Sequence, residues 1–175
     1  MIHPGLCRHL SGHRVPFALI GAVALAMHGV ARFTADVDLM ATDPQVLRPA
    51  FWNGFDGPRP VLTQGDAEDP LAGVARFALS PQHDLIVGKS AGTRLALESA
   101  ERLEGIPCPV VTPLALLALK AEAGSPQDAH DARALLEAQA QLGNTSLAGQ
   151  FRELLPSLGK DPLAFVTRFR LLEGL

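Results

Sequence analysis

Two neighbouring stretches decide the fold, GAVALAMHG at residues 21–29 and RFTADVDL at residues 32–39. Together they predict a glycine turn, a short apolar helix, a loop and a strand. Because successive side chains of a strand point to opposite faces, Asp36 and Asp38 must share one face. Carboxylates this close repel each other unless a cation such as Mg²⁺, which prefers oxygen ligands, lies between them. The glycine turn suits a phosphate, so the two stretches indicate phosphoryl or nucleotidyl transfer.

The composition limits the number of domains and the kinds of partner that the protein can have. The chain has 175 residues, of which 47% are hydrophobic and 19% charged, which fits one compact domain or one domain with a small appendage. The net charge of −3 means that a nucleic-acid partner would need a local basic patch. The longest apolar run, at residues 17–27, is too short to span a membrane. Cys7 and Cys108 are expected to be reduced thiols in a cytoplasmic protein.

The sequence predicts a mixture of strands and helices in the first part of the chain and helices alone in the last part. Strands are predicted at 17–20, 35–41, 61–63, 73–79 and 83–87, with one or two more within 102–111. Helices are predicted at 1–14, 22–28, 44–52, 92–100, 113–123, 126–142, 146–156 and 161–173. This pattern predicts an α/β (α+β) fold with a mixed core over residues 1–111 and a helical C-terminal part over 112–175, packed as one compact unit.

A third acid, Asp84, lies in the otherwise apolar strand QHDLIV at residues 82–87. Aspartate is depleted in strands, so its presence there is unusual. If this strand is a neighbour of the one with Asp36 and Asp38, three carboxylates converge and could hold one or two metal ions. The alternative is that all three are solvated residues at strand ends.

A lysine on a later helix gives an independent indication of a site. Lys120 borders a broad apolar face, and Asp128 and Asp131 border the core side of the next helix. An interhelical salt bridge of purely structural value is one interpretation. The other places Lys120 at a substrate triphosphate and Asp131 as its orienting partner or a proton acceptor, and the two are compatible.

The sequence alone does not decide the roles of the residues just before the Asp-x-Asp strand. Arg32 could neutralise phosphate charge or lie on a solvated loop. His28, at the end of the short helix, is expected to be a packing or capping residue. In the helix predicted at 161–173, Arg168 and Arg170 are too few for a nucleic-acid patch.

The pattern G-A-x-A-x-x-x-H-G-x-x-R-x-T-x-D-x-D-L at residues 21–39 resembles the minimal nucleotidyltransferases of the polymerase-beta-like superfamily. The segment LLALKAEAGSPQDAHD at residues 116–131 is similar to the helical motif of the abortive-infection branch, whose members include toxins of toxin–antitoxin pairs. The resemblance covers residues 16–40 and 112–137 well, is loose between them, and is not diagnostic at 143–175.

The resemblance implies a nucleotidyltransferase-like mixed sheet with flanking helices, and a Mg²⁺-dependent transfer of a nucleoside monophosphate from an NTP to a hydroxyl of tRNA, a protein or a small molecule. Two Mg²⁺ ions and an antitoxin partner are part of that expectation. The roles it implies are metal binding by Asp36, Asp38 and Asp84, catalysis by Asp84, Lys120 and Asp131, and nucleotide binding by Gly21, Ala22, Arg32 and Thr34.

Two departures from the family pattern support other hypotheses. Ala22 stands where many members have Ser or Gly, and Ser125 stands where a basic residue is usual. Both changes remove groups that could contact a triphosphate or an RNA. The alternatives are therefore a catalytically degenerate domain that binds a nucleotide or a partner protein, or a structural module in which the acids are exposed strand ends.

Overall fold

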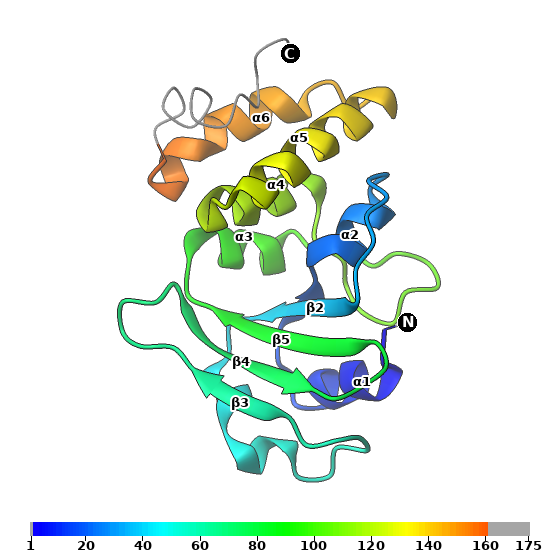
Figure 1. Ribbon diagram of the computed structural model, residues 1–175, viewed down its shortest axis with the longest axis vertical. Coiled ribbons are helices and arrows are strands. Elements are labelled where there is room, and N and C mark those ends of the chain that lie inside the picture. Colours follow the sequence, from blue (N-terminus) through cyan, green and yellow to red (C-terminus); the bar gives the residue numbers. More distant parts are fainter. Residues whose placement is uncertain (1, 161–175) are drawn as a thin grey trace.

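The structure is a computed structural model that describes residues 2–160 and centres on a five-stranded mixed sheet (Figure 1). The strand order is β1-β2-β5-β4-β3. The strands are β1 (Phe17–Leu19), β2 (Asp36–Ala41), β3 (Val61–Gln64), β4 (Leu71–Phe77) and β5 (Gln82–Gly88). Strand β2 runs parallel to β5 and antiparallel to β1, while β4 is antiparallel to both β3 and β5.

Helices α2 to α6 gather on the β2 side of the molecule, and β3 lies at the far edge of the sheet (Figure 1). The helices are α1 (Pro4–Gly12), α2 (Gly21–Met27), α3 (Ala91–Glu98), α4 (Pro113–Ala123), α5 (Pro126–Gln141) and α6 (Leu147–Leu154). Short 3₁₀ helices occur at η1 (Pro44–Leu47), η2 (Pro49–Trp52) and η3 (Leu155–Leu158). Within the part of the chain that the structure describes, no helix combines the length and apolar character needed to cross a bilayer.

Local sequence explains the sharp turn from α4 to α5. Gly124 ends α4 in the left-handed conformation, with φ of 67°, which glycine adopts without steric cost. Ser125 then begins α5 through a capping box in which its hydroxyl accepts from the Asp128 backbone N–H and the Asp128 carboxylate accepts from the Ser125 backbone N–H. This turn brings the last turn of α4 and the first turn of α5 side by side.

Strand alternation divides the central sheet into two faces. Val37, Leu39 and Leu85 are buried on one face, and Trp52 and Phe77 pack there as a T-shaped pair. Helix α1 closes this face, where the backbone N–H of His3 donates to Nε2 of His83 at 3.0 Å. The opposite face carries the acidic residues of β2 and β5. The core is therefore on one side of these strands, and the polar side chains are free for another role.

The structure differs from the sequence-based expectations in two places. The helix expected at 44–52 is two 3₁₀ helices, because Pro49 has no N–H to continue a helix and holds Arg48 in an extended conformation. The strands expected within 102–111 were wrong. Val110 forms only isolated bridges to Leu19 and Glu101, since Pro107 and Pro109 interrupt pairing. The helix expected at 161–173, with Arg168 and Arg170, lies outside the described residues.

Candidate active site

The structure brings together the three acids singled out in the sequence, on one face of the central strands. Asp36 and Asp38 are alternate residues of β2, with Val37 buried between them on the other face. Strand β5 lies parallel beside β2, and the register pairs Asp38 with Asp84 and Asp36 with Gln82. Side chains paired across neighbouring strands point to the same face. The order of strands thus produces a patch of three carboxylates from residues up to 48 positions apart.

The glycine turn that begins α2 packs directly against one of these acids. Gly21 has φ of +67°, and a Cβ built at this position would lie 2.3 Å from Oδ2 of Asp38. The backbone N–H of Ile20 donates to the Asp38 carbonyl at 2.9 Å, which fixes the turn to the strand. Only glycine fits here, for both conformational and steric reasons.

We expect Gly21→Ala to destabilise the protein by about 1–3 kcal/mol, because the new methyl group meets Asp38 and the backbone is held at positive φ. Gly149→Ala is the matched control, since Gly149 lies inside α6 with no atom within 4 Å of its added Cβ. That control is expected to be neutral or slightly stabilising. Urea unfolding of both variants measures the effect, and equal stabilities would contradict it.

Burial and the neighbouring negative charges both change the pKa of Asp38. Burial raises the pKa of Asp38 from 3.8 to about 6, and repulsion from Asp84 and Asp36 adds to the rise, while Lys120 and Arg32 oppose it. Among residues 2–160, no side chain donates a hydrogen bond to the carboxylate of Asp36 or Asp38. The Asp38 carboxylate is therefore relieved either by protonation, which removes its charge, or by a further cation, which stabilises it.

This pKa shift predicts a pH-dependent stability. The native state holds the Asp38 proton between about pH 4 and pH 6 while the unfolded chain has lost it, so this carboxyl lowers stability as the pH rises through that window. The full penalty above the folded pKa is at most about 3 kcal/mol. Asp38→Asn should remove it, so the stability of the variant relative to the wild type should rise between pH 4 and pH 7 in urea unfolding. Parallel pH profiles for the two proteins would contradict the shift.

The third acid, Asp84, has a partner that the sequence analysis did not identify. Arg76 of β4 is its register partner and donates from Nη2 to Oδ2 at 2.7 Å and from Nε to Oδ1 at 3.0 Å. The Asp84 side chain is 10% exposed, whereas that of Arg76 is 58% exposed. An arginine between Ala75 and Phe77 in one predicted strand, with an acid in the next predicted strand, was the signal that could have indicated a cross-strand ion pair.

The acids fit a divalent cation in their chemistry, although they are not arranged as a complete ligand set. Asp36 and Asp38 provide hard oxygen donors on one face, and their mutual repulsion favours a cation. Across residues 2–160, no three His, Cys, Asp or Glu side chains already come together as a metal site. At this patch, Arg76 engages both carboxylate oxygens of Asp84.

Lys120 bridges α4 and α5 close to the acidic patch. Its Nζ donates to Oδ1 of Asp128 and to Oδ2 of Asp131, both at 2.8 Å. Asp131 is buried, and it also accepts from Arg32 at 3.1 Å and from Gln127 at 2.8 Å. The interhelical salt bridge is therefore present. With its oxygens occupied by these donors, Asp131 is arranged to orient Lys120 and Arg32 rather than to contact a substrate.

The remaining residues of the sequence-based site have mixed surroundings. The hydroxyl of Thr34 accepts from the Asp36 backbone N–H at 3.3 Å and so shapes the entry to β2. Ala22 is buried in the first turn of α2. His28 donates from Nε2 to the Val111 carbonyl at 2.7 Å, as expected for a packing histidine. Both cysteines are free thiols and buried.

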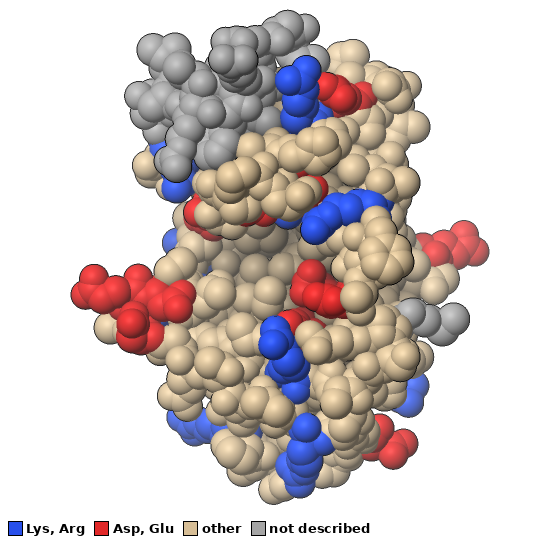
Figure 2. All heavy atoms as spheres, viewed as in Figure 1, with Lys and Arg blue, Asp and Glu red and all other residues tan. Residues whose placement is uncertain are grey.

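A pocket of about 360 Å³ opens between the sheet and α4, next to the acidic patch. Asp38, Gly21 and Lys120 line it together with apolar residues such as Leu71 and Leu116. Figure 2 shows this face hollowed between the sheet and the helices, with acidic and basic side chains around the hollow. Apolar walls with a few charged groups at one end are typical of a small-molecule site.

Glu122 adds an unexpected acid to the same pocket. Its carboxylate accepts from the Gly92 backbone N–H at 2.9 Å and from the Ser90 hydroxyl at 2.5 Å, at the N-terminus of α3. These bonds occupy the positive end of α3 and tie that helix to α4. This wall of the pocket is thus fixed by a carboxylate from within the chain.

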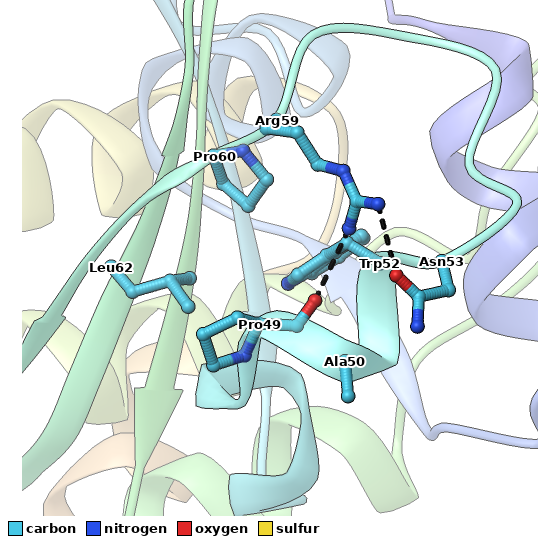
Figure 3. Close-up of a pocket in the computed structure, with 7 residues that line it drawn as sticks. All are labelled: Pro49, Ala50, Trp52, Asn53, Arg59, Pro60 and Leu62. Carbon is cyan, nitrogen blue, oxygen red and sulfur yellow. Dashed lines mark hydrogen bonds between the residues drawn. The ribbon is translucent and has the colours of Figure 1, made fainter.

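A larger pocket, of about 550 Å³, lies by β3 and η2 (Figure 3). Arg59 crosses it and donates to the Pro49 carbonyl at 3.2 Å and to Oδ1 of Asn53 at 2.9 Å. Its lining contains proline, alanine, leucine, asparagine, tryptophan and arginine, with no carboxylate, histidine or cysteine. The chemistry therefore favours the smaller pocket beside Asp38 as the functional site.

Comparison with solved structures identifies the architecture. The antibiotic-resistance factor ANT(2″)-Ia, in a structure with adenylyl-2″-tobramycin, matches with a TM-score of 0.56 at 16% identity, over 95% of each chain. The chain has the nucleotidyltransferase fold. The solution structure of ANT(2″)-Ia gives 0.55 at 16% identity, over 98% of this chain and 92% of that one. A candidate nucleotidyltransferase from H. pylori gives 0.51 at 16% identity, over 98% and 80%.

The nucleotidyltransferase fold confirms the mixed sheet with flanking helices that the resemblance implied. No family model matches the sequence, and no curated protein matches it either. At 16% identity the likeness concerns the fold, and function has to be argued from the site itself.

Proposed function

We propose that the protein is a nucleotidyltransferase that moves a nucleoside monophosphate from an NTP to a hydroxyl acceptor in a Mg²⁺-dependent reaction. One observation carries the proposal. Asp38 lies in register with Asp84 and against the Gly21 turn, at the mouth of a pocket that Lys120 also lines. Phosphoryl transfer depends on positioning the reactants and stabilising charge. Carboxylates could bind metal ions, the backbone at Gly21 could contact phosphate oxygens, and the Lys120 ammonium could offset the charge of the triphosphate.

Asp36 and Asp38 are the residues that would hold divalent cation, with Asp84 as the third ligand of a two-ion site. When bound, such ions neutralise triphosphate charge and lower the pKa of the attacking hydroxyl. The raised pKa of Asp38 supports this assignment, because strongly perturbed carboxylates are concentrated at functional sites and a bound cation would offset the repulsion from Asp36 and Asp84.

The triphosphate would be bound by groups on both sides of the pocket. Lys120, held by Asp128 and Asp131, offers a positioned ammonium, and Arg32 offers a guanidinium whose side chain is 39% exposed. The Gly21-Ala22 turn would allow phosphate oxygens to approach the backbone closely, and Thr34 would shape the loop beside them.

In the reaction, the acceptor oxygen forms a bond to the α-phosphorus while the bond from that phosphorus to the bridging oxygen breaks, which releases pyrophosphate. Asp84 would take the proton of the acceptor hydroxyl. The protein's own contribution is mainly to position the two reactants and to stabilise charge. Lys120 and Arg32 would offset the charge that builds up on the triphosphate.

A small molecule is the acceptor that the site favours. The pocket is about 360 Å³ with mostly apolar walls, and the chain has a net charge of −3, which gives no general attraction for tRNA. The similar ANT(2″)-Ia structure contains an adenylylated small molecule. A protein acceptor, a toxin role with an antitoxin partner and a cytoplasmic location remain sequence-based predictions.

The test is incubation of the protein with each α-labelled NTP, Mg²⁺ and a panel of hydroxyl-bearing small molecules, tRNA and protein. Label should pass to an acceptor with the wild type, and be lost with Asp38→Ala or with excess chelator. Equal label with wild type and Asp38→Ala would contradict the assignment. NTP binding by calorimetry without turnover would instead support the alternative of a degenerate nucleotide-binding domain, which Ala22 and Ser125 motivate.

A further inference from the structure

The pairing of Arg76 with Asp84 has the geometry of a forked ion pair. Both carboxylate oxygens are engaged, Oδ2 by Nη2 at 2.7 Å and Oδ1 by Nε at 3.0 Å. Gln82 adds a longer contact from its amide to Oδ1 at 3.4 Å. In this arrangement, the oxygens of Asp84 are already satisfied by donors from the protein.

The same carboxylate lies in register with Asp38, at the patch proposed to bind divalent cation. A guanidinium on Asp84 and a metal ion on Asp84 use the same two oxygens and are both cations, so they compete for this carboxylate and repel each other. Asp36 and Asp38, by contrast, have no hydrogen-bonded cation among residues 2–160. In this patch, the Asp36 and Asp38 carboxylates therefore accept no hydrogen bond from a cationic side chain of residues 2–160, whereas Asp84 is paired with Arg76.

The two partners differ in their freedom to move. Asp84 is buried in a central strand, so its position is set by the sheet. Arg76 has a side chain that is 58% exposed, so its guanidinium can be hydrated when it leaves the pair. Asp84 would then be a buried carboxylate without a partner, which is costly unless another cation takes the place of the arginine. If the pair opens, the arginine is the member that moves.

We propose that Arg76 is a displaceable latch, which occupies Asp84 in the resting protein and has to release it before that carboxylate can bind divalent cation. The proposal rests on the proposed function of the same site. Arg76 offsets the charge of the Asp84 carboxylate until a divalent metal ion replaces the guanidinium. It also makes Arg76 a residue that sets metal affinity without being a metal ligand.

The test measures Mn²⁺ binding to the nucleotide-free protein by calorimetry. Arg76→Gln should bind Mn²⁺ about five- to tenfold more tightly than the wild type, because the competing cation is gone. Arg32→Gln removes a nearby charge that does not contact Asp84 and should change the affinity by about twofold or less. Arg133→Gln removes the distant, exposed pair with Glu137 and should change nothing.

The latch would be overturned if Arg76→Gln and the wild type bound Mn²⁺ equally, or if Arg32→Gln had the same effect as Arg76→Gln. Absence of Mn²⁺ binding in every protein would overturn the metal site and the latch with it. A second readout is the Nε–H resonance of Arg76, which should shift on addition of Mg²⁺ to the wild type. An unchanged resonance at saturating Mg²⁺ would mean that Arg76 stays on Asp84, and would also contradict the proposal.

Discussion

Replacing either Asp36 or Asp38 by Asn is expected to lower kcat/KM for nucleotidyl transfer by at least about 10³-fold, equivalent to about 4 kcal/mol of transition-state stabilisation. Asn keeps the size of the side chain but removes the negative charge that a divalent cation needs. Because the two acids lie on one face of β2 and would act as one ligand set, the double variant should be hardly worse than either single one.

Steady-state rates with labelled NTP, measured for both single variants and the double variant, check this prediction. Asp56→Asn is the matched control, since Asp56 is an exposed residue of the loop after η2. It should retain full activity. Retained transfer in either single variant, or independent losses that multiply in the double variant, would show that Asp36 and Asp38 do not bind metal together.

The largest effect on stability is expected from Asp131→Ala. Asp131 is 1% exposed and accepts from Lys120, Arg32 and Gln127, so its removal leaves the mostly buried Lys120 with Asp128 alone. Loss of one member of a buried ion pair costs about 3–5 kcal/mol, and the partial exposure of Arg32 places the expected value near 3 kcal/mol.

Glu137→Ala is the control on the same helix. It breaks the pair of Glu137 with Arg133, whose side chains are 54% and 56% exposed, and should cost about 0.5 kcal/mol or less. The free energies of unfolding in urea give both values. Equal losses would mean that the Lys120 cluster contributes no more than a surface pair, and would remove the reason to assign Lys120 a fixed position at the pocket.

Much of the fold could be predicted because the decisive signals are local. Alternation fixes the shared face of Asp36 and Asp38, and Thr112, Gly124 and Ser125 mark the ends of α4 and α5. The order of the predicted elements indicated an α/β (α+β) fold, and the resemblance of residues 21–39 and 116–131 to the nucleotidyltransferases implied the mixed sheet with flanking helices. The predicted strands at 102–111 failed because apolar residues there suggested pairing, whereas the prolines prevent it.

The partners of the acids could not be predicted, because they depend on which strands lie side by side. Arg76 and Asp84 are eight residues apart, and only the antiparallel register of β4 and β5 pairs them. Glu122 reaches the N-terminus of α3 from α4 in the same non-local way. Lys120 and its acids could be predicted because they lie on consecutive helices, whereas the pairing of β4 with β5 and the approach of α4 to α3 depend on the tertiary fold.

The most direct test of the proposed site is a crystal of the protein soaked with Mn²⁺ and a non-hydrolysable NTP analogue, examined by anomalous diffraction. The manganese signal should lie between the carboxylates of Asp36 and Asp38, with the triphosphate toward Lys120 and the Gly21 turn. A nucleotide in the pocket beside Trp52, or manganese at neither of these acids, would contradict a nucleotidyltransferase site on this face of the central strands.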